Sequence, residues 1–226
     1  ADFRTGKTDS EATAELVALL RDGSEEETAD GVIDLLNRGV APESIWDGLM
    51  CGAAELLMRN PGILSLHAVT TTNAIRYIYE RSSTEETRRM LLLQNASFLP
   101  FYRRRSEPSG ERIDGLTPLE IETTAETAVE DICATIGRDN GGAARKILGY
   151  LERGYAPKAL IDAANRLVFL KGNDSHDYKF SAAVLEDCRR LSPVWRDRYL
   201  AASAFWLNGL GAPDNDMVLR ARLALS

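Results

Sequence analysis

Histidine and cysteine are scarce in this chain, whose 226 residues include two histidines and three cysteines. Cys51, Cys133 and Cys188 are scattered, and none has a partner in a C-x-x-C pair. This spacing excludes a disulfide framework and a cysteine-rich zinc site. Since all three cysteines lie within apolar helical patterns, we expect them to be buried thiols.

Positive charge and long apolar runs are also lacking. The net charge is -7, and the one basic run, at 103–105, has Glu107 and Glu111 close by. Phosphate binding requires clustered positive charge, so we expect no nucleic-acid partner. No stretch approaches the roughly 20 apolar residues of a membrane helix, and the start of the chain has no signal-peptide pattern. We therefore expect a cytoplasmic protein without a membrane span.

Strand patterns are nearly absent, whereas signals for the starts and ends of helices are frequent. Ser24 precedes three glutamates and an apolar series that ends at Gly39, which is the order expected of a capped helix. The segments 83–86 and 117–120 each predict a further capped helix start. These patterns indicate a protein built almost wholly from helices.

The sequence also contains an internal repeat. Residues 36–42 read Leu-Asn-Arg-Gly-Val-Ala-Pro, and residues 151–157 read Leu-Glu-Arg-Gly-Tyr-Ala-Pro. In each segment a helix is expected to end at the Arg-Gly corner and a new helix to begin at the proline. We therefore predict an all-α fold of two pseudo-repeated helical units, 1–102 and 117–226. A linker at 103–116 joins them, and they pack as one compact domain.

The two histidines follow the corresponding corners, His67 by 28 residues and His176 by 22. Each is expected near the start of a helix, where Ser65 and either Asp174 or Ser175 could act as caps. One interpretation is a hydrogen-bonded core histidine and a capping histidine at the surface. The other is that the repeat brings the two imidazoles together as metal ligands. Metal sites usually have at least three protein ligands, so this interpretation requires ligands of another type.

The residue one turn after each histidine shares its helix face. It is Thr70 in the first unit and Lys179 in the second. A lysine on an inward face is costly to bury as an ammonium. Either its side chain extends to solvent or pairs with a carboxylate, or it has reacted with carbon dioxide to form a metal-binding carbamate. We expect Thr70 and Asp177 to orient the imidazoles from outside the ligand set.

Two short motifs resemble a known family. Residues 67–70 fit H-x-V-T and residues 176–183 fit H-x-x-K-x-x-x-A, an order that is similar to the questin oxidase-like family. Members are helical oxygenases that oxidise or open anthraquinone-type polyketides. The resemblance implies a non-haem iron with His67 and His176 as ligands and Lys179 as a carbamate ligand. It also implies an oxidoreductase that uses dioxygen on a small aromatic or quinone-like substrate. We assign no catalytic residue beyond the metal ligands.

The chain departs from that family in one respect, because the family's additional histidines have no counterpart here. Another chain, or a region preceding Ala1, would have to supply them. Two alternatives stay open. One is a bis-histidine haem protein, for which two histidines suffice and Lys179 is at most a propionate partner. The other is a helical-repeat interaction module without catalysis, whose histidines would lie apart or face solvent.

Overall fold

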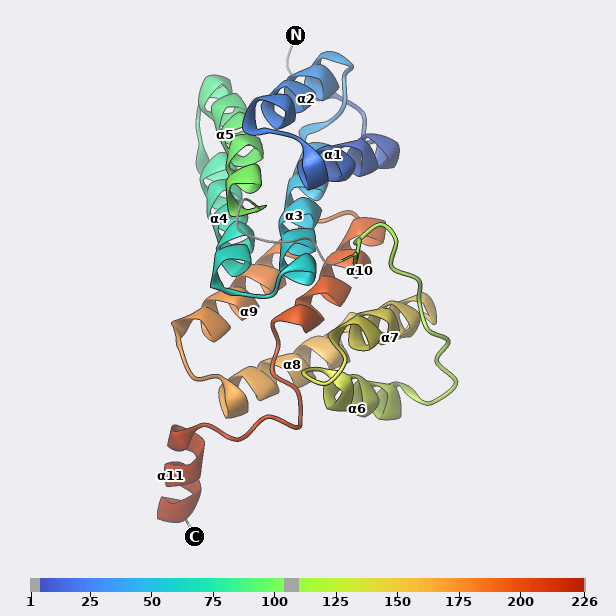
Figure 1. The fold of residues 1–226 in the computed structure, drawn as a ribbon, viewed down its shortest axis with the longest axis vertical. Helices are drawn as coiled ribbons and strands as arrows, with labels where there is room; N and C mark the ends of the chain where they lie inside the picture. Colours follow the sequence, from blue (N-terminus) through green and yellow to red (C-terminus); the bar gives the residue numbers. More distant parts are fainter. Residues whose placement is uncertain (1–4, 104–109, 226) are drawn as a thin grey trace.

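The computed structural model describes residues 5–103 and 110–225. Within these ranges the chain forms eleven α-helices and no strand, only an isolated backbone bridge between Lys7 and Val40. The predicted all-α fold is therefore confirmed (Figure 1). The helices are α1 (Ser10–Asp22), α2 (Glu25–Asn37), α3 (Pro42–Arg59), α4 (Ile63–Arg81), α5 (Glu85–Arg103), α6 (Ala125–Thr135), α7 (Asn140–Glu152), α8 (Pro157–Lys171), α9 (Ser175–Asp187), α10 (Pro193–Ala202), the short 3-10 helix η2 (Ser203–Phe205) and α11 (Asp216–Leu225). Among these helices, none is long and apolar enough to cross a membrane.

Local capping accounts for the start of several helices. Ser24 caps α2, because its hydroxyl accepts a hydrogen bond from the Glu27 N–H at 3.2 Å. The Glu27 carboxylate in turn accepts from the Ser24 N–H at 2.7 Å, which completes a capping box. The predicted start of this helix is confirmed.

Two other predicted starts are wrong. The cap of α5 is Thr84, whose hydroxyl accepts from the Thr87 N–H at 3.2 Å, not the preceding serine. Thr117 caps no helix, because α6 begins after Thr124, whose hydroxyl accepts from the Thr127 N–H at 3.4 Å. Any serine or threonine near an acidic residue satisfies the capping pattern. The pattern alone therefore does not select one of several neighbouring candidates.

The repeated Arg-Gly corner has the same geometry in both places. Gly39 and Gly154 have φ angles of 80° and 81°. The N–H of each donates to the carbonyl three residues earlier, at 3.0 and 2.9 Å. Pro42 and Pro157 then occupy the first turns of α3 and α8. The repeat of the complete units remains a prediction.

We expect Gly39→Ala to lower the free energy of unfolding by about 1–2 kcal/mol, because an alanine pays that cost in the left-handed region. The space around the added methyl is open, so no steric clash contributes. Gly62→Ala is the matched control, since Gly62 has an extended φ of 173° and its methyl would approach no atom closer than 4.0 Å. Urea unfolding measures both. Equal losses for the two variants would contradict the conformational explanation.

The two halves share one core. In Figure 1, α1–α5 lie above α6–α10, and α3 contacts α10 while α4 contacts α9. The Cys51 thiol donates to the Trp195 carbonyl at 3.7 Å, and the Trp195 indole N–H donates to the Ser10 hydroxyl at 3.1 Å. Buried apolar side chains from both halves form one continuous cluster. The α4–α9 contact is the one that positions the two histidines.

Part of the predicted linker, residues 104–109, lies outside the described residues. The remainder, 110–116, packs between the halves. Ile113 is fully buried; its N–H donates to the Glu55 carboxylate at 3.0 Å and its carbonyl accepts from Arg198 at 2.6 Å. These bonds attach the segment to α3 and to α10. The division of the chain into units at 103–116 remains a prediction.

Candidate metal centre

His67 lies in the second turn of α4 and is exposed. Ser65, expected to cap this helix, is instead buried inside it. Its hydroxyl donates to the Gly62 carbonyl at 3.1 Å, so it stabilises the turn before the helix without accepting from a free N–H. The expectation of a Ser65 cap is wrong, although His67 does lie near the helix start.

His176 is the second residue of α9 and is held by the N-cap of that helix. Asp174 accepts from the His176 backbone N–H at 2.7 Å, and the same oxygen lies 3.2 Å from the imidazole Nδ1. The backbone hydrogen bond from His176 lowers the pKa of the Asp174 carboxyl. The His176 side chain is 28% exposed. A carboxylate on Nδ1 orients the ring and leaves Nε2 available to a ligand.

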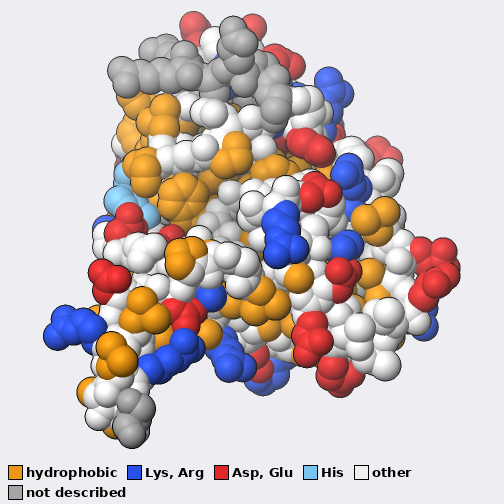
Figure 2. All heavy atoms as spheres, turned by 60° about the horizontal axis from the view of Figure 1, so that its bottom comes forward, with side chains coloured by type: hydrophobic (Ala, Val, Ile, Leu, Met, Phe, Trp, Pro, Cys, Tyr) orange, Lys and Arg blue, Asp and Glu red, His pale blue; other side chains and the backbone are white. Residues whose placement is uncertain are grey.

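The two imidazoles lie side by side between α4 and α9. Their ring centroids are 5.4 Å apart, with the ring planes inclined at 72°. Figure 2 shows the histidine side chains at the surface, next to hydrophobic side chains. The only two histidines of the chain, 109 positions apart in sequence, are therefore brought together by the packing of two helices.

Further along the same helices, Asn73 fixes the α4–α9 contact. Its side-chain amide donates to Asp187 at 2.8 Å and to Glu186 at 3.1 Å. Tyr199 on α10 donates to the other oxygen of Asp187 at 2.8 Å. Asp187 is fully buried, and burial raises the pKa of its carboxyl to about 6. This network sets the relative positions of α4, α9 and α10, and so of the two histidines.

The residues expected to assist the histidines face solvent or have backbone partners of their own. Lys179 is exposed, which agrees with the alternative in which its side chain extends to solvent. The Thr70 hydroxyl donates to the Leu66 carbonyl of its own helix at 3.3 Å. The Asp177 carboxylate accepts from the Asn173 N–H at 2.9 Å. Lys179 lies three residues after His176, and α9 turns about 100° per residue. The Lys179 side chain therefore points about 60° away from the direction of the His176 side chain.

The donor set fits part of the iron site that the resemblance implies. Within 5–103 and 110–225, no group of three or more His, Cys, Asp or Glu residues could hold a metal ion. His67 and His176 supply two imidazoles, whereas the further histidines of the questin oxidase-like site have no equivalent in this part of the chain. A carbamate forms most readily on a lysine sheltered from water, and Lys179 lacks that shelter.

The three cysteines do not belong to this site. Cys51, Cys133 and Cys188 are all buried, as predicted. Burial raises the pKa of each thiol. A buried thiol with a raised pKa is a poor nucleophile and a poor metal ligand.

An apolar cavity of about 40 Å³ lies beneath α9, one turn beyond His176. Phe180 and Val184 of α9, Leu160 of α8 and Leu200 of α10 contribute to its walls. An engineered cavity of roughly 150 Å³ binds benzene. The cavity beneath α9 is therefore too small to hold an aromatic ring.

Compared with known proteins, the chain matches no family model, no curated protein and no solved structure at a significant level. The resemblance to the questin oxidase-like family therefore rests on the two short motifs at 67–70 and 176–183.

Proposed function

We propose that this chain binds a divalent transition-metal ion through the imidazoles of His67 and His176. The observation that carries this proposal is the 5.4 Å separation of the two rings. Imidazole nitrogen is a favoured ligand for iron, zinc, copper and nickel. Two imidazoles from packed helices, one of them oriented by a carboxylate, form a common beginning of a metal site in a helical protein.

The packing of the two helices favours a single metal ion over a haem. A ring separation of 5.4 Å is compatible with one ion held by both imidazoles, and it is also the ordinary spacing of two rings packed edge to face. Bis-histidine haem requires a flat macrocycle between the two rings, whereas α4 and α9 are in direct contact. Non-haem metal binding is therefore the better supported of the two.

We propose oxygenase activity of the questin oxidase type as the reaction class, with dioxygen and a small aromatic or quinone-like substrate. A bound iron would supply the activation of dioxygen. The protein's own part is to hold two imidazoles in place, with Asp174 orienting His176 and the Asn73–Asp187 network fixing α4 against α9. The exposure of His67 leaves room for substrate and for ligands from another chain.

Metal binding tests this proposal directly. Protein stripped with a chelator is expected to take up about one equivalent of Zn²⁺ or Fe²⁺, measured by calorimetry and elemental analysis. His67→Ala and His176→Ala should each weaken binding by more than about 100-fold, because losing even an outer-shell partner costs 10–100-fold. Asp174→Asn should cost about 10-fold on the same grounds.

Lys179→Ala is the matched control, since Lys179 shares α9 with His176 but faces solvent. We expect it to bind metal as the unsubstituted protein does. Undiminished binding in both histidine variants would contradict the site. A loss of binding in Lys179→Ala would instead support a carbamate ligand. Oxygen uptake by the iron-loaded protein with an anthraquinone-type probe then tests the reaction class.

The second candidate is a helical interaction module without catalysis. It is favoured by the exposure of His67 and Lys179, which places the candidate site at the surface instead of in a substrate pocket. In that case the purified protein holds no metal, and both histidine variants behave as the unsubstituted protein does.

A further inference from the structure

A long stretch of α4 and a long stretch of α5 carry no charged residue. Residues 63–75 and 90–102 contain no aspartate, glutamate, lysine or arginine, in a chain in which 27% of residues are charged. The two stretches lie on adjacent antiparallel helices. Thr71, midway along α4, hydrogen-bonds to Tyr102, the second-last residue of α5, at 3.0 Å. The uncharged stretches therefore form one continuous surface.

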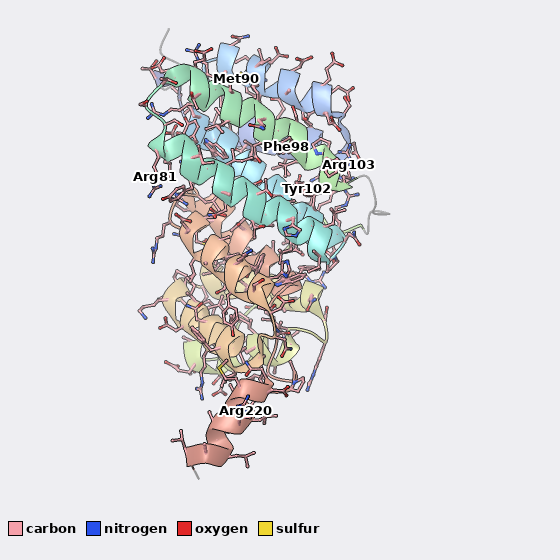
Figure 3. The ribbon with its side chains drawn as sticks, turned by 90° about the vertical axis from the view of Figure 1, so that its left-hand side faces the viewer. Arg81, Met90, Phe98, Tyr102, Arg103 and Arg220 are labelled. Carbon is pink, nitrogen blue, oxygen red and sulfur yellow. The ribbon has the colours of Figure 1, made fainter. Side chains whose placement is uncertain are left out.

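This surface exposes large apolar side chains in two parallel stripes. Along α5, Phe98 is 42% exposed, Phe101 55% and Met90 60%. Figure 3 looks onto the surface, with α4 and α5 crossing it and Met90 and Phe98 along α5. We define the α4–α5 face as the exposed residues of the two stripes: Ile63, His67, Ala74, Ile78, Met90, Gln94, Phe98 and Phe101.

The spacing within each stripe is that of a helix bundle. Successive positions are separated by three or four residues from Met90 to Phe101 on α5, and Ala74 and Ile78 continue the same pattern on α4. Exposed apolar stripes with this spacing normally pack against another helix, at a crossing angle of about 20°. Neither stripe has such a helix against it in the described part of the chain, since all eight residues are exposed.

We propose that the α4–α5 face binds the same face of a second copy of this chain, forming an isologous dimer with a four-helix interface. In an isologous contact residue i of one copy meets residue j of the other, and j meets i, so an uncharged face complements itself without any pairing of opposite charges. The chain carries a net charge of -7, so two copies repel each other as whole molecules. An uncharged face is therefore a part of the surface on which two copies can meet with little added repulsion.

The size of the face suits a reversible dimer. A 19-residue helix is about 28 Å long and about 10 Å wide, so two helices side by side present on the order of 560 Å². A standard stable interface buries about 800 Å² on each partner. We therefore expect association in the micromolar range. His67 belongs to the face, so the second copy would also lie beside the histidine pair.

Helix α11 is the surface that competes with this assignment. None of its residues is buried, and Met217 and Leu223 are 78% and 79% exposed. However, Arg220 and Arg222 interrupt its apolar residues, and it projects from the end of the molecule away from α5 (Figure 1). Leu223 is therefore a suitable control position.

Sedimentation velocity with a chelator present tests the dimer without any metal-bridged association. Between about 1 and about 200 µM the unsubstituted chain is expected to pass from monomer to dimer. Phe98→Glu on α5 and Ile78→Glu on α4 should each raise the dissociation constant by at least about 100-fold, because each buries an unpaired charge twice in the symmetric interface. Leu223→Glu should leave it unchanged.

Circular dichroism checks that each variant is folded, and two variants on different helices guard against the failure of one. A monomer at every concentration would overturn the proposal, as would a dimer that persists in both Phe98→Glu and Ile78→Glu. A dimer lost only in Leu223→Glu would also overturn it and would assign the interface to α11. None of these results affects the metal-binding proposal, because the chelator removes metal ions from the sedimentation experiment.

Discussion

Arg21→Ala is expected to lower the free energy of unfolding by about 3–5 kcal/mol, the usual cost of removing one partner from a buried ion pair. Arg21 extends from α1 into the interior, where its guanidinium donates to both oxygens of Glu55 at 2.6 and 2.8 Å and to Asp114 at 2.9 Å. The hydrogen bond with Glu55 raises the pKa of Arg21. Without the guanidinium, the Glu55 carboxylate remains buried, with its side chain 4% exposed. Its remaining ion-pair partner is then Arg59, at 3.8 Å.

The matched control is Arg38→Ala, which removes an ion pair with Glu15 of similar length, 2.9 Å, but with both side chains more than half exposed. Exposed pairs contribute roughly 0–1 kcal/mol, so this variant should differ little from the unsubstituted protein. Urea unfolding measures both. If Arg21→Ala lowers the free energy of unfolding by less than roughly 1 kcal/mol, the charges of Arg21, Glu55 and Asp114 are hydrated, in conflict with the burial described above.

Asp187 is expected to make the protein less stable as pH rises from about 4 to about 6. Burial raises the pKa of this carboxyl to about 6, from 3.8 in the unfolded chain. Between these values the folded state holds a proton that the unfolded state has released. Unfolding therefore becomes easier as pH rises, and the contribution of Asp187 levels off above the folded pKa. A shift of this size corresponds to about 3 kcal/mol.

Asp187→Asn should remove this dependence, because an amide resembles the protonated carboxyl and can still accept from Asn73. At about pH 7.5 we expect the variant to be more stable than the unsubstituted protein, and this advantage should vanish below the unfolded pKa of 3.8, where the carboxyl is protonated in both states. Glu186→Gln is the control with the opposite sign, because the hydrogen bond from Arg190 lowers the pKa of Glu186. Its deficit should appear at neutral pH and shrink in acid. Parallel profiles for both variants would contradict the assignment.

The helical fold could be predicted from sequence because its signals are local. Capping at Ser24, the corner glycines Gly39 and Gly154 and the prolines that follow them act within a few residues. The Thr84 and Thr124 caps were missed for the same reason, since several neighbouring residues satisfy one short pattern. The sequence predicted that the elements are helices, whereas it did not predict the first residue of every helix.

The candidate site depended on contacts that no local pattern contains. The repeat favoured a meeting of His67 and His176, and the two rings are adjacent. The direction of Lys179 could not be derived, because it depends on how α9 rotates against α4. The buried carboxyl of Asp187 gave no signal, since it follows Glu186 in a segment that is typical of an exposed helix face. Only the fold brings Asn73 and Tyr199 to it.

The joint binding of one metal ion by His67 and His176 is tested most directly by ¹⁵N NMR of protein labelled only in histidine. The chain has two histidines, so the spectrum contains two imidazoles and needs little assignment. During a titration with Zn²⁺ as a diamagnetic probe, both imidazoles should shift together and stop shifting at one equivalent. A shift of one ring alone, or of neither, would contradict the shared site.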